Sequence, residues 1–258
     1  MIQIGFCGGP ERMAETAAAG FDYLELPLCQ IAGLSDAEFE KTRAALQNAP
    51  IPTPSFNVCL PGTIALFGGE NPEAELETYL EGAFARARLL GGRVVVFGSG
   101  RSRTRPEGMA YGDAFRQLIR ETRLMGKIAE KNGLTIAIEP LNREETNMIN
   151  SIAEGAALAA AVDHPNVKLL ADYYHIAKDG EPAEDIARVS GIAHAHIATL
   201  EGRRVPTEEL DGFRRMFSAM RRTGYRGLIS VEGHSDDLAK DGPVSVRMLK
   251  NLYESCAD

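Results

Sequence analysis

The stretch LTIAIEPLNREE at residues 134–145, followed by VKLLADYYH at 167–175, carries the pattern that decides the fold. Each part begins with a short apolar run and ends that run on a carboxylate, Glu139 in the first and Asp172 in the second. His175 follows three residues after Asp172. Acidic side chains at strand ends, just before loops, are typical of functional sites rather than of packing. We interpret this stretch as half of a divalent-metal site, whose other half is His196 and Glu232.

Apolar runs of the same kind recur along the whole chain and alternate with segments of helical periodicity. The eight predicted strands are 2–7, 23–28, 54–59, 93–98, 134–139, 167–172, 193–198 and 228–232. Eight strand–helix units at a spacing of about 30 residues favour a closed α/β barrel, a (β/α)8 TIM barrel, over an open doubly wound sheet. We predict one barrel domain spanning residues 1–258.

Strand alternation predicts where the carboxylates point. Helices cover the outside of a barrel, so Ile136 and Ile138 should face outward and Glu139 inward, at the end of its strand. By the same alternation Glu232 faces inward, and His196 lies on the inner face of the seventh predicted strand. Together with Asp172, four ionisable groups from the last four strands should converge in the upper barrel.

Three carboxylates so close together repel one another unless a cation compensates them. Two glutamates, one aspartate and one imidazole form an oxygen-rich ligand set, which suits Mn²⁺, Mg²⁺ or Co²⁺ better than a thiolate-preferring metal. We expect one divalent ion, Mn²⁺ first, with Mg²⁺, Co²⁺ or Zn²⁺ as alternatives. Any one of these residues taken alone is more typical of a satisfied core group.

Composition restricts the class of protein. The 258 residues carry a net charge of −8 and a pI near 5.3, which argues against a protein that mainly holds nucleic-acid phosphates. The four cysteines show no CxxC pair and no zinc-like spacing, so we interpret them as reduced thiols. The sequence opens without a signal-peptide pattern, and no apolar run approaches the ~20 residues of a membrane span. We predict a cytoplasmic protein that binds neither nucleic acid nor membrane.

The motifs EPLNREE, ADYYH, HAHIATLEGRRVP and SVEGH resemble those of the xylose isomerase-like TIM barrels. Within these, the chain is most similar to the D-tagatose/D-psicose 3-epimerases and their hydroxypyruvate isomerase relatives. The likeness covers nearly the whole chain and is strongest over 134–234. It implies a sugar isomerase or epimerase that acts on a free or phosphorylated ketose.

The resemblance implies roles residue by residue. Its metal ligands fall on Glu139, Asp172, His196 and Glu232, and its two catalytic acid/bases on Glu139 and Glu232. Groups that hold the ketose carbonyl oxygen fall on His175 and Arg203, and a carboxylate for the terminal hydroxyl falls on Glu145. The family arginine usually follows the metal histidine by six residues, whereas Arg203 follows His196 by seven. Arg204 therefore stays open as the alternative.

Several reactions fit such a site. The metal acidifies a C–H bond beside the carbonyl, and one glutamate removes that proton. Return of a proton to the opposite face gives 3-epimerisation, which we expect; delivery to the adjacent carbon gives aldose–ketose or hydroxypyruvate-type isomerisation. The same residues could expel a hydroxyl, as in inosose or dehydroshikimate dehydratases. Apurinic-site endonucleases share the barrel but need earlier histidines than this chain has, and a non-catalytic metabolite-binding barrel is the remaining alternative.

The sequence allows more than one role for several charged residues and loops. Arg101, Arg103 and Arg105 either grip a substrate phosphate or make ion pairs on a solvated loop. Glu25 is either a group beside the metal site or part of an ion pair lower in the barrel. The loops 60–70 and 98–110 should lie over the barrel mouth, with apolar Ile64, Leu66 and Phe67 exposed as a lid or partner contact. A homodimer or homotetramer is one hypothesis for the assembly.

Overall fold

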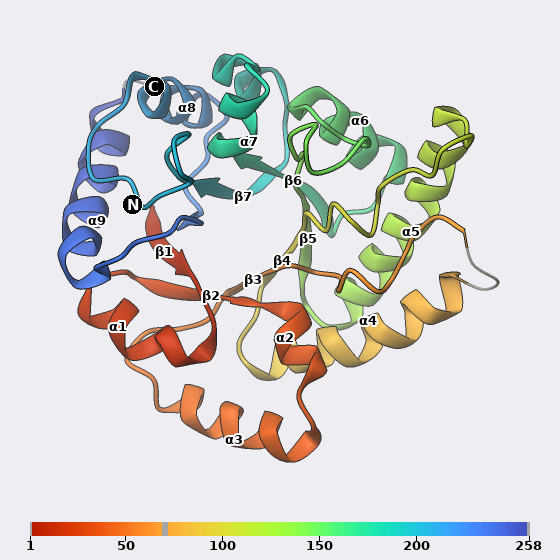
Figure 1. Ribbon diagram of the computed structural model, residues 1–258, viewed down its shortest axis with the longest axis horizontal. Helices are drawn as coiled ribbons and strands as arrows, with labels where there is room; N and C mark the ends of the chain where they lie inside the picture. Colours follow the sequence, from red (N-terminus) through yellow and green to blue (C-terminus); the bar gives the residue numbers. More distant parts are fainter. Residues whose placement is uncertain (1, 69–71, 257–258) are drawn as a thin grey trace.

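A computed structural model describes residues 2–68 and 72–256, and its eight parallel strands close into a barrel in sequence order (Figure 1). The strands are β1 (Gln3–Cys7), β2 (Tyr23–Pro27), β3 (Ser55–Asn57), β4 (Val94–Phe97), β5 (Thr135–Ile138), β6 (Val167–Asp172), β7 (Ile192–Ile197) and β8 (Leu228–Val231). The predicted (β/α)8 TIM barrel is therefore confirmed. β3 is shorter than the predicted 54–59, because Val58 adopts a left-handed φ of 48° that ends the strand.

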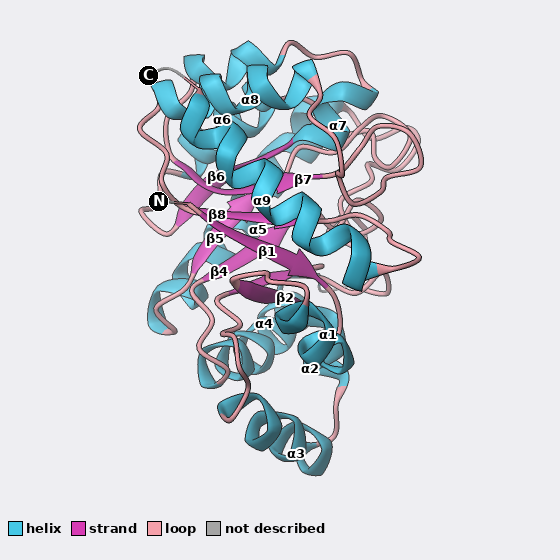
Figure 2. Cartoon of the chain, turned by 90° about the vertical axis from the view of Figure 1, so that its left-hand side faces the viewer, coloured by secondary structure: helices cyan, strands magenta, loops and turns pink. Residues whose placement is uncertain are grey.

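Helices surround the strands on the outside of the barrel (Figures 1 and 2). They are α1 (Met13–Ala18), α2 (Leu28–Gly33), α3 (Asp36–Gln47), α4 (Pro72–Leu89), α5 (Tyr111–Lys131), α6 (Ile152–Val162), α7 (Tyr173–Lys178), α8 (Asp211–Arg222) and α9 (Leu238–Ser255). Two short 3-10 helices, η1 (Pro10–Arg12) and η2 (Ala183–Arg188), complete the described elements. In the described part of the chain, no helix has the length and apolar character that crossing a bilayer requires.

The predicted strand alternation is confirmed by two separate clusters of buried apolar side chains. Ile136 and Ile138 belong to the large cluster that joins the strands to the helices. Ala137, between them, belongs to a small second cluster on three adjacent strands, with Val94, Val96 and Leu170. The small cluster therefore fills part of the barrel interior, and Glu139, two residues after Ala137, continues the inward-facing side.

The two long loops after β3 and β4 pack on each other. The backbone N–H of Leu66 donates to the Ser102 carbonyl at 2.8 Å, and Gln117 Nε2 donates to the Leu66 carbonyl. Ile64, Leu66 and Phe67 are only 6, 0 and 5% exposed. The prediction that these apolar side chains are exposed is therefore wrong, because all three belong to the large apolar cluster. Residues 69 and 70 of the predicted lid lie outside the described part.

Candidate functional site

Four side chains meet at the carboxyl ends of β5 to β8. Glu139 and Glu232 each follow the last residue of their strand, Asp172 ends β6, and His196 lies near the end of β7. Each offers a ligand atom, and these atoms all lie within 4.8 Å of one another. His196 Nδ1 lies 3.3 Å from Glu139 Oε1 and 3.4 Å from Glu232 Oε2. The structure thus brings together the four residues that the sequence analysis assigned to a metal.

Three of the atoms that face this point have no hydrogen-bond partner among the described residues. They are Glu139 Oε1, Asp172 Oδ2 and His196 Nδ1, and all three are buried. An unpartnered buried acceptor costs about 1–3 kcal/mol, and more when it is charged. A divalent cation bound between these atoms would satisfy them at once, and three carboxylates with one imidazole form a donor set suited to such an ion. The residues present therefore fit a metal ion.

The pKa values of the three carboxyl groups in the cluster shift in different directions. Burial raises the pKa of Glu139 and of Asp172, although the His196 imidazole opposes the rise in both. Burial would also raise the pKa of Glu232, but His196 and Arg203 lower it to about 2. Glu232 Oε1 accepts a hydrogen bond from Asn57 Nδ2 at 2.9 Å, and its Oε2 accepts one from Arg203 at 2.5 Å. Glu232 is thus held as a carboxylate.

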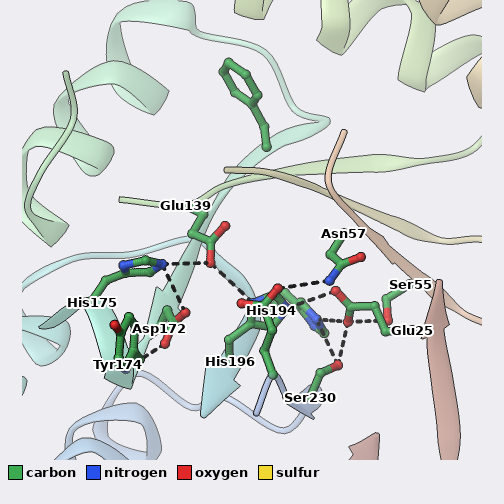
Figure 3. A network of polar contacts seen from close by, with 12 residues as sticks. Glu25, Ser55, Asn57, Glu139, Asp172, Tyr174, His175, His194, His196 and Ser230 are labelled. Carbon is green, nitrogen blue, oxygen red and sulfur yellow. Dashed lines mark hydrogen bonds and ion pairs between the residues drawn. The ribbon is translucent and has the colours of Figure 1, made fainter. Parts of the chain in front are cut away.

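His175 lies beside the cluster, and its hydrogen bonds indicate which ring nitrogen carries the proton. Its Nδ1 accepts from the Asn142 backbone N–H at 3.1 Å. That bond leaves the proton of the neutral ring on Nε2, which is buried, unpartnered and 3.5 Å from Asp172 Oδ2 (Figure 3). Burial lowers the pKa of His175, which favours this neutral form. An N–H donor therefore points toward the same centre as the carboxylates.

The structure places Arg203, not Arg204, at this centre. Arg203 lies 3.5 Å from Glu145 Oε1, and its guanidinium carbon lies 4.5 Å from the centre of the Tyr174 ring. Arg203 adopts a left-handed φ of 46°, which turns it into the barrel mouth. Arg204 instead pairs with Asp236 at 2.6 Å, and both side chains are largely exposed.

A cavity of about 350 Å³ opens above the cluster, a size typical of small-molecule sites. Polar groups on its wall include all three residues to which the resemblance gave substrate contacts: His175, Arg203 and Glu145. Ser99 lines the cavity too, and its Oγ accepts from the Leu60 backbone N–H.

A buried polar network adjoins the cluster (Figure 3). Glu25, fully buried, lies 2.6 Å from His194 Nε2 and 2.9 Å from His196 Nε2. Ser55 and Ser230 donate to the same carboxylate. Burial would raise the pKa of Glu25, but the two imidazoles hold it well below its ordinary value. Of the two placements left open for Glu25, the structure supports the one beside the metal site.

Sequence reasoning missed two residues of the site. Asn57 binds Glu232 from β3, far away in sequence, and only the closed barrel brings them together. Asn142 holds His175 with both its backbone N–H and its side-chain amide, which lies 2.8 Å from Nδ1. Asn142 stands within EPLNREE, so the motif itself was the available signal.

Comparison with known proteins gives three results. A sequence profile of the family described as xylose isomerase-like TIM barrel matches residues 13–252. A Streptomyces coelicolor protein, provisionally named a hydroxypyruvate isomerase, is 24% identical over 239 residues, which cover 86% of this chain and 84% of that protein. An L-ribulose 3-epimerase of Methylomonas sp. is 33% identical over 118 residues, or 45% of this chain and 41% of the epimerase.

A solved structure also matches. A crystal structure of D-psicose 3-epimerase in the presence of D-fructose superposes with a TM-score of 0.86 at 18% identity. The match covers 97% of this chain and 99% of the other. At this identity the match establishes the shared fold.

Proposed function

The chain belongs to the xylose isomerase-like TIM barrel family, and from this premise we propose that it is a divalent-metal-dependent sugar epimerase or isomerase. The resemblance seen in the motifs is confirmed by the family match. Its relatives are named as ketose epimerases and a hydroxypyruvate isomerase, and the chain is an enzyme of this isomerase class. The reaction we expect first is 3-epimerisation of a ketose.

The observation that carries the proposal is the convergence of unpartnered buried atoms from Glu139, Asp172 and His196. With Glu232 they would hold one divalent ion, and Mn²⁺ suits the donor set first, with Mg²⁺, Co²⁺ or Zn²⁺ as alternatives. When bound, such an ion supplies Lewis-acid polarisation of a carbonyl and its neighbouring hydroxyl.

The side chains around the cavity would perform the proton transfers. One of the two glutamates, Glu139 or Glu232, removes the proton from the carbon beside the carbonyl, and the other supplies one to the opposite face. His175 directs its Nε2–H at the carbonyl oxygen, where negative charge develops. Arg203 supports the same oxygen, and Glu145 accepts a hydrogen bond from a terminal hydroxyl. The net result is inversion of one carbon centre.

A second reaction, hydroxypyruvate-type isomerisation, is favoured by one observation. The alignment with the Streptomyces protein, provisionally named a hydroxypyruvate isomerase, covers 84% of that relative. In this reaction the proton returns to the adjacent carbon, so the carbonyl moves along the chain. The same glutamates serve both reactions.

The experiment is incubation of the Mn²⁺-loaded protein with a panel of ketoses and hydroxypyruvate in D₂O. NMR after chelation of the metal locates the deuterium: at C3 with inversion for an epimerase, at the carbon next to a displaced carbonyl for an isomerase. Loss of water from a substrate would identify a dehydratase and contradict the proposal. Complete absence of exchange would favour a non-catalytic binding barrel.

Variants test the two-glutamate mechanism. Glu139→Gln and Glu232→Gln should each lower kcat by about 10²–10⁴-fold, the usual contribution of a general acid or base. Glu144→Gln is the matched control, because Glu144 is exposed in the same motif and pairs only with Lys178 in the described structure. Normal turnover in either of the first two variants would refute the mechanism.

Two further expectations belong to the proposal. The whole chain, residues 1–258, would be this one barrel domain, and limited proteolysis should leave a single resistant core. Sedimentation equilibrium would test the assembly predicted from the sequence, which is a homodimer or homotetramer. A monomer at enzyme-assay concentration would overturn that prediction alone.

A further inference from the structure

The three arginines of the loop 98–110 differ in what they contact. Arg103 is fully buried and donates to the carbonyls of Phe97 and Glu139, at 3.0 and 2.6 Å. Arg105 donates to the Met109 carbonyl within its own loop. Both therefore hold the loop in shape. Arg101 is exposed and lines the cavity above Glu139, and no ion pair joins it to a carboxylate within residues 2–68 and 72–256.

The loop geometry places Arg101 close to the reaction centre. Ser99 adopts a left-handed φ of 43°, and its carbonyl accepts from the N–H groups of Ser102 and Arg103. This tight turn puts Arg101 near its tip. Gly98 touches the centre itself, since a Cβ there would lie 2.1 Å from Glu139 Oε2. The backbone from Gly98 to Arg101 spans at most about 10 Å, because each residue adds at most about 3.5 Å. The Arg101 backbone therefore lies close enough to Glu139 for a short sugar to reach both.

The opposite loop holds the side chain over the cavity. A Cβ at Gly62 would lie 2.8 Å from Arg101 Cδ, so the arginine stem lies directly against that glycine. Ser102 Oγ donates to the Pro61 carbonyl and joins the same two loops. The guanidinium is thus placed at the cavity rim by packing between loops.

Arg203, the other arginine on the cavity wall, has its charge already engaged. It pairs with Glu232 at 2.5 Å and lies near Glu145 and Asp172. Arg101 therefore supplies the unengaged positive charge of this wall among the described residues. A guanidinium fork matches the two oxygens of a carboxylate or phosphate.

We infer that Arg101 forms an anion subsite, so the substrate is a hydroxyketone that carries a carboxylate or a phosphate at the end remote from the metal ligands. This inference rests on the proposed function of the same cavity. It selects, within the sugar epimerases and isomerases, an acidic substrate over a neutral one.

Two matched pairs of compounds test the inference and separate the two anions. Hydroxypyruvate is compared with dihydroxyacetone, and D-ribulose 5-phosphate with D-ribulose, in the Mn²⁺-loaded enzyme. Solvent deuterium incorporation, followed by mass spectrometry, gives kcat/KM for each compound. The proteins are the wild type, Arg101→Gln, Arg101→Lys and the control Arg116→Gln, whose exposed arginine on α5 pairs with Asp113.

The wild type should prefer the anionic member of one pair, and Arg101→Gln should lose about 10- to 100-fold in kcat/KM for that member, mostly through KM. Arg101→Lys should keep part of the preference, and neutral compounds should change by less than about twofold. The pair that shows the preference identifies carboxylate or phosphate. Equal use of both members by the wild type, or an unchanged preference in Arg101→Gln, would overturn the subsite.

Calorimetric measurement of hydroxypyruvate and D-ribulose 5-phosphate binding to the same proteins distinguishes failure of the anion subsite from failure of the proposed function. If no compound exchanges deuterium but one anion binds only when Arg101 is present, the subsite stands and the proposed function fails. If neutral ketoses exchange and neither anion binds through Arg101, the proposed function stands and the subsite fails.

Discussion

Glu25 Oε1 lies 2.9 Å from His196 Nε2, on the other side of the imidazole from the unpartnered Nδ1. Glu25 comes from β2, a strand that provides none of the four proposed ligands. A carboxylate that accepts the Nε2–H fixes the ring orientation and leaves the Nδ1 lone pair directed at the centre. Glu25 thus orients His196, the proposed nitrogen ligand.

Replacement of this carboxylate should weaken metal binding. Glu25→Gln should lower the affinity for Mn²⁺ by about 10- to 100-fold, the usual effect of losing the partner of a metal-binding histidine. Isothermal titration of the metal-free protein with Mn²⁺ measures it. Ser55→Ala removes one hydrogen bond to Glu25 and leaves the His196 contact, so it should bind Mn²⁺ nearly as the wild type does. Equal affinity in Glu25→Gln would contradict this role.

The two neighbouring arginines should respond differently to substitution. Arg203→Gln removes the partner of Glu232 and Glu145 and should lower kcat/KM by about 10²-fold, as loss of a partly buried, charge-assisted hydrogen bond predicts. Arg204→Gln removes only the exposed pair with Asp236, and because solvent screens exposed ion pairs, it should leave turnover nearly unchanged. Steady-state kinetics on both variants decides. A larger defect in Arg204→Gln would reverse the assignment.

Two glycines give opposite predictions. Gly98→Ala should abolish activity, because the new methyl group would displace the Glu139 carboxylate. The ideal Cβ position at residue 98 lies only 2.1 Å from Glu139 Oε2. Gly82 lies inside α4, and among the described residues no atom lies within 4 Å of the position of a new methyl group. Because alanine favours a helix more than glycine does, Gly82→Ala should raise the free energy of unfolding by about 0.5–1 kcal/mol. Kinetics and urea unfolding check both. An active Gly98→Ala protein would show that Glu139 can move freely.

The stability of the metal-free protein should fall as the pH rises from about 5 to about 8. Burial raises the pKa of Glu139 and Asp172, so the folded chain keeps protons that the unfolded chain has already lost. His196 adds to the trend: burial lowers its pKa, but Glu25 and Glu232 raise it well above its ordinary value. Two groups act in the opposite direction: His175, whose pKa burial lowers, below about pH 6.5, and Glu232 below about pH 4.5, the ordinary values of a histidine and a glutamate. The fall in stability should therefore be clearest above about pH 6.5.

Urea unfolding in EDTA at several pH values measures this dependence. Saturating Mn²⁺ should restore stability at the upper end of the range, by about 2.7 kcal/mol when the free metal is 100 times its Kd. Asp172→Asn should flatten the pH dependence, since one titrating group is gone. Stability that rises with pH in the metal-free wild type would contradict the prediction.

Local sequence pattern was enough for the barrel and for the inward direction of Glu139. Alternation along 134–139 separates Ile136 and Ile138 from Ala137 and Glu139, and the two apolar clusters reproduce this division. The end of β3 was not predictable in the same way, because Val58 adopts a left-handed conformation that a β-branched residue rarely takes.

Contacts between distant segments account for the rest. Leu66 looked exposed because its hydrogen-bond partners, Ser102 and Gln117, come more than 30 residues later in the chain. The choice between Arg203 and Arg204 depends on a left-handed backbone and on the Tyr174 ring, neither of which spacing reveals. Asn57 and Glu25 acquire their roles only when β2 and β3 meet β7 and β8 across the barrel.

The central claim is that the unpartnered atoms of Glu139, Asp172 and His196, with Glu232, bind one divalent ion. Titration of the metal-free protein with Mn²⁺, followed by elemental analysis, tests it most directly. We expect about one ion per chain, with affinity at least about 100-fold lower in Asp172→Asn, because loss of a ligand charge costs several kcal/mol. Equal binding by Asp172→Asn, or full activity in protein without any metal, would contradict it.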